Sequence, residues 1–222
     1  MPVRVDYSSV KKTDIYELGR NVIRLGNTVC KIYDYHMREE VNYKRRNNYS
    51  LIKEKLGDNY LPDMKEEKIN DNLTLLTYSF IEGKHYPKTV GQLAKVCLDL
   101  HKFHENGAVH GDIRYINILF GENDYEAYLI DFDFAGTVGT AIYPPNYNKE
   151  GIQERADNAG GNSEIKEEHD VSSMKYIVKS MVNFEKGIDI ENMELKEVVY
   201  HLKSGKAKLK DNVKEILKEK TR

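Results

Sequence analysis

The chain has 222 residues, of which 40% are hydrophobic and 32% are charged. That length allows one large domain or two closely packed lobes, each with its own core. The formal net charge of −2 creates no strong attraction for nucleic acid or an acidic membrane, so no nucleic-acid partner is expected.

The chain contains no long apolar run. A membrane span needs about 20 such residues, so none is expected, and the first residues also lack the apolar stretch of a signal peptide. Its two cysteines, Cys30 and Cys97, each lie inside an apolar pattern. We expect buried small hydrophobes there, not a disulfide or a metal site. These observations favour a soluble protein of the cytoplasm or another reducing compartment.

The first third of the chain has the pattern of strands. Two β-rich runs, at residues 21–25 and 28–33, are separated by a Gly-Asn pair, which is a hairpin signal. Residues 37–56 are rich in charged side chains with apolar positions between them. They predict a partly exposed helix, which Gly57 would end.

In the middle of the chain the spacing of apolar residues changes from that of a strand to that of a helix. A strand is predicted at residues 73–81, and helical spacing of apolar residues follows from 93 to 104. Gly107 suits the left-handed position that ends such a helix. Two short hydrophobic runs, at 116–120 and 128–130, predict a small hairpin.

The last third mixes loop and helix patterns. Residues 146–169 are polar and contain glycines, and they predict a loop. Helical patterns then cover residues 171–182, 195–202 and 209–217.

The most informative residues for chemistry lie between 109 and 133. Asp112, Arg114 and Asn117 share one short segment, and Asp131 ends the hydrophobic run that follows. Phosphoryl transfer needs a carboxylate near the attacking hydroxyl, oxygen ligands for Mg²⁺, and cations to offset the phosphate charge. These side chains supply all three. Taken alone, however, Asp112 could also be a turn residue.

The motif His-x-Asp-x-x-x-x-Asn, at residues 110–117, and the triplet Asp-Phe-Asp, at 131–133, resemble the protein kinase-like family. The resemblance implies an α+β, bilobal fold. A small β-rich N-lobe with the hinge would span residues 1–83. A reduced, mainly helical C-lobe, with the catalytic loop, the metal-binding segment and a shortened helical end, would span 84–222. It also implies ATP and Mg²⁺, with Mn²⁺ as a possible substitute.

The same resemblance assigns roles to residues of the motif. Asp112 matches the catalytic base, and Arg114 matches the phosphate-facing cation. Asn117 matches the second metal ligand, and Asp131 matches the metal ligand that bridges the phosphates. His110 matches a buried residue that orients the loop.

Other residues match supporting positions of the family. Asp170 resembles the buried aspartate that caps the following helix and holds the catalytic loop. Lys31, in Val-Cys-Lys-Ile, resembles the lysine that pairs with the α- and β-phosphates, although a strand lysine could simply face solvent. Its partner would be Glu40, with Glu39 as the alternative; either could equally be an ordinary exposed helix residue.

The nucleotide base would lie against the strand at residues 73–81. There the resemblance makes Tyr78 the residue at the back of the pocket, and backbone groups of Ser79 and Ile81 the partners of adenine. Gly19 alone lies where the family has a glycine-rich phosphate loop.

Two departures from the family affect function. Gly111 stands where regulated kinases carry an arginine that receives an activation-loop phosphate, so such switching is not expected. Asp133 replaces the usual glycine and either adds a second carboxylate near the metals or faces solvent.

We therefore expect transfer of the γ-phosphoryl group of Mg-ATP to a hydroxyl, most simply a protein Ser or Thr. A kinase acting on small molecules such as sugars, aminoglycosides or choline is the alternative. A non-catalytic pseudokinase module ranks lower.

Overall fold

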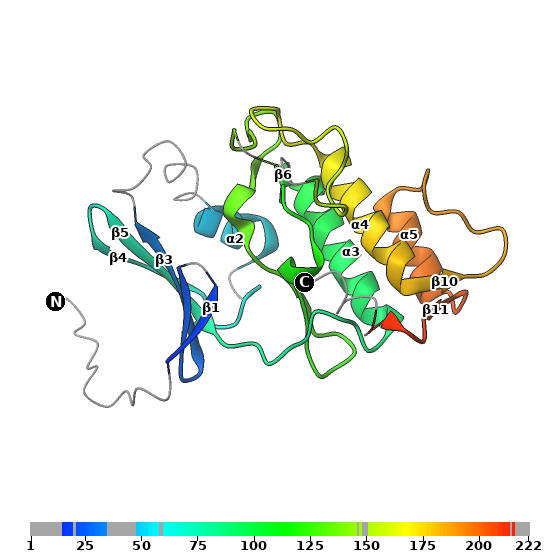
Figure 1. Ribbon diagram of the computed structural model, residues 1–222, viewed down its shortest axis with the longest axis horizontal. Coiled ribbons are helices and arrows are strands. Elements are labelled where there is room, and N and C mark those ends of the chain that lie inside the picture. The colour runs from blue at the N-terminus through cyan, green and yellow to red at the C-terminus, as the bar shows by residue number, and fades with distance from the viewer. Residues whose placement is uncertain are drawn as a thin grey trace.

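The structure is a computed structural model. It describes residues 15–19, 21–34, 48–57, 60–145, 147, 151–213 and 215. The predicted α+β class is confirmed: the described residues form a five-stranded antiparallel sheet, four α-helices and three two-stranded sheets. Figure 1 shows the large sheet at one end of the molecule and helices α3, α4 and α5 side by side toward the other.

The five-stranded sheet has the order β1-β2-β3-β5-β4. Its strands are β1 (Ile15–Gly19), β2 (Val22–Leu25), β3 (Thr28–Asp34), β4 (Lys65–Asn70) and β5 (Leu73–Ser79). The hairpin predicted at residues 21–33 is β2–β3, with Leu25 opposite Thr28. The strand predicted at 73–81 is β5, two residues shorter. Sequence reasoning missed β1 and also β4, in which every residue is exposed.

The pairing of β3 with β5 decides which side chains face the rest of the molecule. Val29 lies opposite Tyr78, and Lys31 lies opposite Leu76. Because side chains alternate along a strand and directly opposite residues share a face, all four belong to one face of the sheet. Lys31 and Tyr78 therefore lie on the same side.

Helix α2 (Asn48–Leu56) is the described part of the helix predicted at residues 37–56. It ends at Gly57, as predicted, and this glycine has a φ of +103°, which a side chain would disfavour. Its apolar positions Leu51, Ile52 and Leu56 are buried. Residues 35–47 lie outside the described part of the chain.

Helix α3 (Val90–Glu105) forms the centre of the main core, as its helical pattern predicts. The Thr89 hydroxyl accepts a hydrogen bond from the Gln92 N–H at its start, and Gly107, with a φ of +73°, follows its end. Leu93, Val96, Cys97, Leu100 and Phe103 have no exposed surface. The prediction for the cysteines is confirmed: Cys30 and Cys97 are both buried and free.

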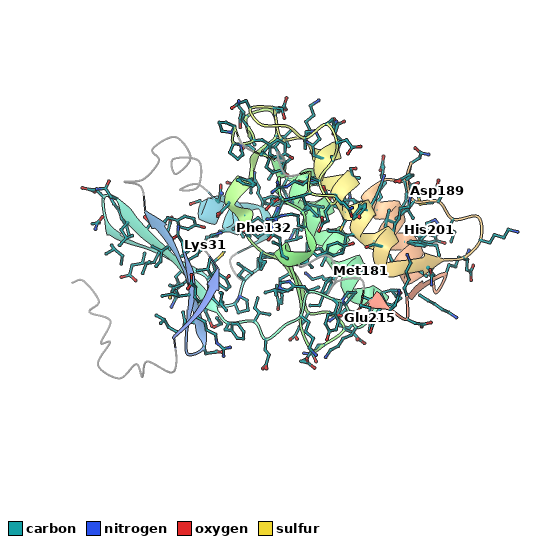
Figure 2. The ribbon with its side chains drawn as sticks, viewed as in Figure 1. Lys31, Phe132, Met181, Asp189, His201 and Glu215 are labelled. Carbon is teal, nitrogen blue, oxygen red and sulfur yellow. The ribbon has the colours of Figure 1, made fainter. Side chains whose placement is uncertain are left out.

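Short elements follow α3 and position the candidate site. They are β6 (Ala108–Val109), the 3-10 helix η3 (Tyr115–Asn117), β7 (Ile118–Phe120), β8 (Ala127–Leu129), the 3-10 helix η4 (Phe132–Phe134) and β9 (Gly136–Thr137). The predicted hairpin is β7–β8. Its first strand begins at Ile118, because residues 116–117 belong to η3. Phe132 lies between the sheet and the helices (Figure 2) and packs edge-on against Phe103.

The last elements are α4 (Glu167–Met181), β10 (Val182–Phe184), α5 (Leu195–Lys203) and β11 (Ala207–Leu209). Helix α4 begins four residues before the prediction, at an acidic first turn that favours a helix N-terminus. The prediction of a helix from residue 209 is wrong at its start. Leu209 lies in β11, where it pairs with Val182. No helix of the described residues is long and apolar enough to cross a membrane.

The predicted loop at residues 146–169 is confirmed up to α4, for the residues that are described there. It is not loosely packed: Tyr143, Tyr147, Ala156, Ala159 and Ile165 form a second buried cluster with neighbouring residues.

Candidate active site

The segment from His110 to Asn117 is held in place by Asp170, near the start of α4. Asp170 accepts hydrogen bonds from the backbone N–H of His110 at 2.7 Å and of Gly111 at 2.8 Å. His104 on α3 lies 3.1 Å from the same carboxylate. Gly111 has a φ of +79°, and a Cβ there would meet the Ile165 side chain at 3.0 Å. The positive φ and this close neighbour therefore favour glycine at position 111.

His110 connects this segment to the residues that follow β8 and lead into Asp131. It is fully buried, and its Nε2 lies 3.2 Å from the carbonyl oxygen of Ile130. The Asp112 N–H donates to its Nδ1 at 3.3 Å. Burial lowers the pKa of the imidazole, so the ring is neutral at pH 7, with its proton on Nε2.

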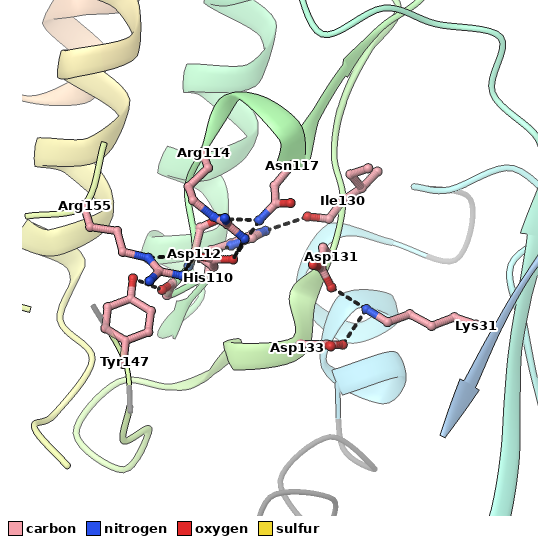
Figure 3. A network of polar contacts seen from close by, with 11 residues as sticks. Lys31, His110, Asp112, Arg114, Asn117, Ile130, Asp131, Asp133, Tyr147 and Arg155 are labelled. Atoms are coloured by element: carbon pink, nitrogen blue, oxygen red, sulfur yellow. Dashed lines mark hydrogen bonds and ion pairs between the residues drawn. The ribbon is translucent and has the colours of Figure 1, made fainter. Parts of the chain in front are cut away.

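Asp112 points into a cluster of donors. Its Oδ2 accepts from Arg114 Nη2 at 2.7 Å and from Asn117 Nδ2 at 2.9 Å (Figure 3). The Asn117 amide also donates to the Asp112 carbonyl at 2.8 Å, because the turn of η3 brings it back toward Asp112. Arg114 Nε is buried and has no hydrogen-bond partner within the described residues. The guanidinium is thus paired with Asp112 through Nη2, while its Nε–H lacks a partner among the described residues.

Asp131 approaches from the other side of His110. Its backbone is left-handed, with φ 61° and ψ 60°, a conformation that is uncommon outside glycine and concentrates at functional sites. Its carboxylate pairs with Lys31, and its side chain is 37% exposed. Burial alone would raise the pKa of this carboxyl, but the Lys31 ammonium outweighs burial and holds the pKa below its ordinary value. The Arg114 guanidinium acts in the same direction on this pKa.

Asp133 does not simply face solvent, because its side chain is 17% exposed. The other alternative, a second carboxylate near the metals, stays a prediction. The Asp133 carboxylate lies 2.6 Å from Lys31 Nζ, and the Tyr33 hydroxyl donates to it over 3.4 Å. Lys31 therefore lies between two carboxylates (Figure 3). Burial alone would lower the pKa of the Lys31 ammonium, but the negative partners prevail and raise it.

The residues predicted to contact the base lie at the end of β5 and just after it. Tyr78 is half-buried on the Lys31 face, and burial raises the pKa of its phenol. Ser79 donates its N–H to the Pro62 carbonyl at 2.8 Å, so this N–H is already used within the protein. Ile81 follows β5 and packs against the main core.

Gly19 lies at the end of β1, opposite Val22, which in turn lies opposite Lys31. It is therefore level with Lys31, two strands away. Glu40 and its alternative Glu39 lie outside the described residues.

Sequence reasoning missed one residue of this site. Arg155, from the loop before α4, donates to Asp112 Oδ1 through Nη2 at 2.8 Å and Nε at 3.2 Å. Its side chain is 10% exposed. No local motif marks this arginine, because only the folding of the loop brings it to the carboxylate.

The oxygen ligands of the site suit Mg²⁺ bound together with a nucleotide. The Asp131 carboxylate and the Asn117 side-chain oxygen are hard ligands of the kind that Mg²⁺ prefers. Among the described residues no group of three or more His, Cys, Asp or Glu side chains is arranged to hold a metal. Mg²⁺ in nucleotide sites takes one or two protein carboxylates and completes its coordination with phosphate oxygens and water, so this small set fits.

Comparison with known proteins gives one partial similarity. No family model matches the chain. A stretch of 72 residues is 39% identical to part of "Nucleosomal histone kinase 1" of Drosophila melanogaster, covering 30% of this chain and 12% of that protein. The chain is thus similar over a limited stretch to part of a kinase.

Proposed function

We propose that the protein is an ATP-dependent phosphotransferase that moves the γ-phosphoryl group of Mg-ATP to a hydroxyl acceptor. One observation carries the proposal. Asp112, paired with Arg114, and Asp131, paired with Lys31, lie on either side of the buried His110, whose ring contacts the Asp112 N–H and the Ile130 carbonyl. In this proposal residues 1–83 are the N-lobe, residues 84–222 are the C-lobe, and ATP binds between them.

Each residue has a definite task in the proposal. Asp131 and Asn117 would hold Mg²⁺, which neutralises phosphate charge when bound. Lys31 would bind the α- and β-phosphates. Arg114 would direct its unpartnered Nε–H to the γ-phosphoryl group, an anion that satisfies a buried donor.

The chemical step needs a proton acceptor and a fixed geometry. As the acceptor oxygen forms its bond to the γ-phosphorus, the bond from that phosphorus to the β,γ-bridging oxygen breaks and ADP leaves. Asp112 takes the proton of the acceptor hydroxyl. Asp170 fixes the backbone of His110 and Gly111, the two residues before Asp112, and so keeps the Asp112 carboxylate in place without reorganisation during the reaction.

The acceptor that we propose is a Ser or Thr of a protein. The similarity of part of the chain to a protein whose name describes a histone kinase supports it. A small-molecule acceptor is the second candidate. It is favoured by the glycine at position 111 and by the second carboxylate, Asp133, at the Lys31 site.

Incubation with γ-labelled ATP tests the proposal, using generic proteins and a panel of sugars, aminoglycosides and amino alcohols with an ADP readout. We expect transfer to at least one acceptor and its loss in Asp131→Ala. The exposed Asp71→Ala is the matched control and should retain transfer. Transfer that persists in Asp131→Ala would contradict the proposal, as would Mg-ATP binding without transfer to any acceptor.

A further inference from the structure

Arg155 closes the side of Asp112 that Arg114 and Asn117 leave open. Oδ2 receives Arg114 and Asn117, and Oδ1 receives two N–H groups of Arg155. A carboxylate has about four lone-pair sites, so these four donors use its capacity. In this state an acceptor hydroxyl cannot donate its proton to Asp112.

The position of Arg155 is built into the fold. Its guanidinium lies over the Tyr147 ring, 3.9 Å from the centroid. Tyr147 donates its hydroxyl to the Gly111 carbonyl at 2.8 Å and stacks on Tyr143, with 3.9 Å between ring centroids. Both tyrosines belong to the second buried cluster. The same aromatic stack thus supports the 110–117 segment and the arginine that covers it.

Arg155 also lies on a definite side of the site. Figure 3 shows Asp112 between Arg155 on one side and Asp131 with Lys31 on the other. In the proposed function, the Asp131 side holds the nucleotide, so the side of Arg155 is the one from which an acceptor approaches.

We infer that Arg155 is a specificity-determining gate, and that acceptors with an acidic group next to the hydroxyl open it. This inference rests on the proposed function. A hydroxyl must displace the guanidinium to reach Oδ1. Separating the largely buried Arg155 guanidinium from its carboxylate costs free energy unless the guanidinium gains another anion. A carboxylate beside the acceptor hydroxyl supplies that anion through charge-assisted, often bidentate, hydrogen bonds.

Three peptides of equal length test the gate, each with one Ser flanked by Glu, by Gln or by Lys. The measured quantity is kcat/KM for wild type, Arg155→Gln and Arg155→Lys. Wild type should prefer the Glu peptide to the Gln peptide by about tenfold, and the Lys peptide should be poorest. Arg155→Gln should bring the ratio of kcat/KM on the Glu peptide to that on the Gln peptide close to one. Arg155→Lys should give a ratio between those of wild type and Arg155→Gln.

The ratio separates specificity from general damage, because a variant that is only less stable loses activity on all three peptides alike. Lys208→Gln removes an exposed positive charge on β11 and should leave the ratio unchanged. A wild-type ratio near one, or an unchanged ratio in Arg155→Gln, would overturn the gate while the phosphotransferase proposal stands. Transfer to no acceptor at all would overturn both.

Discussion

Lys31 Nζ lies 2.6 Å from Asp133 Oδ1, so the segment that carries Asp131 also supplies a second carboxylate to this lysine. In the proposed function Asp131 would turn to Mg²⁺ when nucleotide binds, and Asp133 would remain with Lys31. The lysine would then keep one fixed anionic partner, which orients its ammonium toward the phosphates.

Asp133→Asn should therefore weaken nucleotide binding. The amide removes the negative charge beside Lys31 but keeps the shape, and we expect the Kd for Mg-ATP to rise about tenfold, the factor of one charge-assisted contact. Titration calorimetry measures it. Asp71→Asn, at an exposed ion pair with Lys68, is the control and should bind like wild type. An unchanged Kd in Asp133→Asn would show that Asp133 does not position Lys31.

Asp170→Ala should be strongly destabilising. It leaves the buried N–H groups of His110 and Gly111 without their acceptor and removes the partner of His104. Hydrogen bonds to a buried charge are strong, so the free energy of unfolding should fall by about 3–5 kcal/mol in urea denaturation. The exposed Asp124→Ala should stay within about 0.5 kcal/mol of wild type. Equal stabilities of the two variants would contradict the role of Asp170.

Neighbouring glycines give a matched test of the loop that carries Arg155. A Cβ at Gly161 would lie 2.2 Å from the Pro145 carbonyl oxygen, whereas a Cβ at Gly160 would meet nothing within 4 Å. Gly161→Ala should cost about 1–3 kcal/mol of unfolding free energy, because backbone must move. Gly160→Ala should change it by less than about 1 kcal/mol. Similar melting temperatures for both variants would show that the loop is not packed as described.

The fold was predictable where the signal is local. The Gly-Asn turn between β2 and β3, the apolar stripe of α3 and the glycines at 57 and 107 all act through neighbouring residues. Strand β4 was missed because all of its side chains are exposed and carry no alternation. Leu209 was assigned to a helix because its pairing with Val182 is a contact between distant parts of the chain.

The residues of the candidate site were likewise predictable only where they are close together in the sequence. The spacing of Asp112, Arg114 and Asn117 was readable because one short segment carries all three. Arg155 was not, because it reaches Asp112 from 43 residues away, through the stack on Tyr147. No pattern in the loop distinguishes it from a solvent-facing arginine.

His110 should make stability depend on pH. Burial places the pKa of its imidazole below the ordinary value near 6.5, so as pH falls the unfolded chain takes up the proton first. The stabilisation is complete above that value and is lost as pH falls toward the lower, folded-state pKa. Urea unfolding of wild type should therefore give a lower free energy at about pH 5.5 than at about pH 7.5.

His110→Gln provides the comparison. The variant should show a smaller difference between the two pH values, whatever its stability at either one. Some dependence should remain, because burial also lowers the pKa of His169. An equal or larger difference in His110→Gln would contradict the neutral, buried state of this ring.

The most direct measurement is mass spectrometry of the products after incubation with Mg-ATP and an acceptor, for wild type beside Asp112→Asn. Asn keeps the shape of the side chain but cannot take the acceptor proton. Wild type should give ADP and a phosphorylated acceptor, and Asp112→Asn should bind Mg-ATP with similar affinity yet form the product at least about 100-fold more slowly. Product formed by Asp112→Asn at the wild-type rate would contradict the role of Asp112 and, with it, the proposed chemistry.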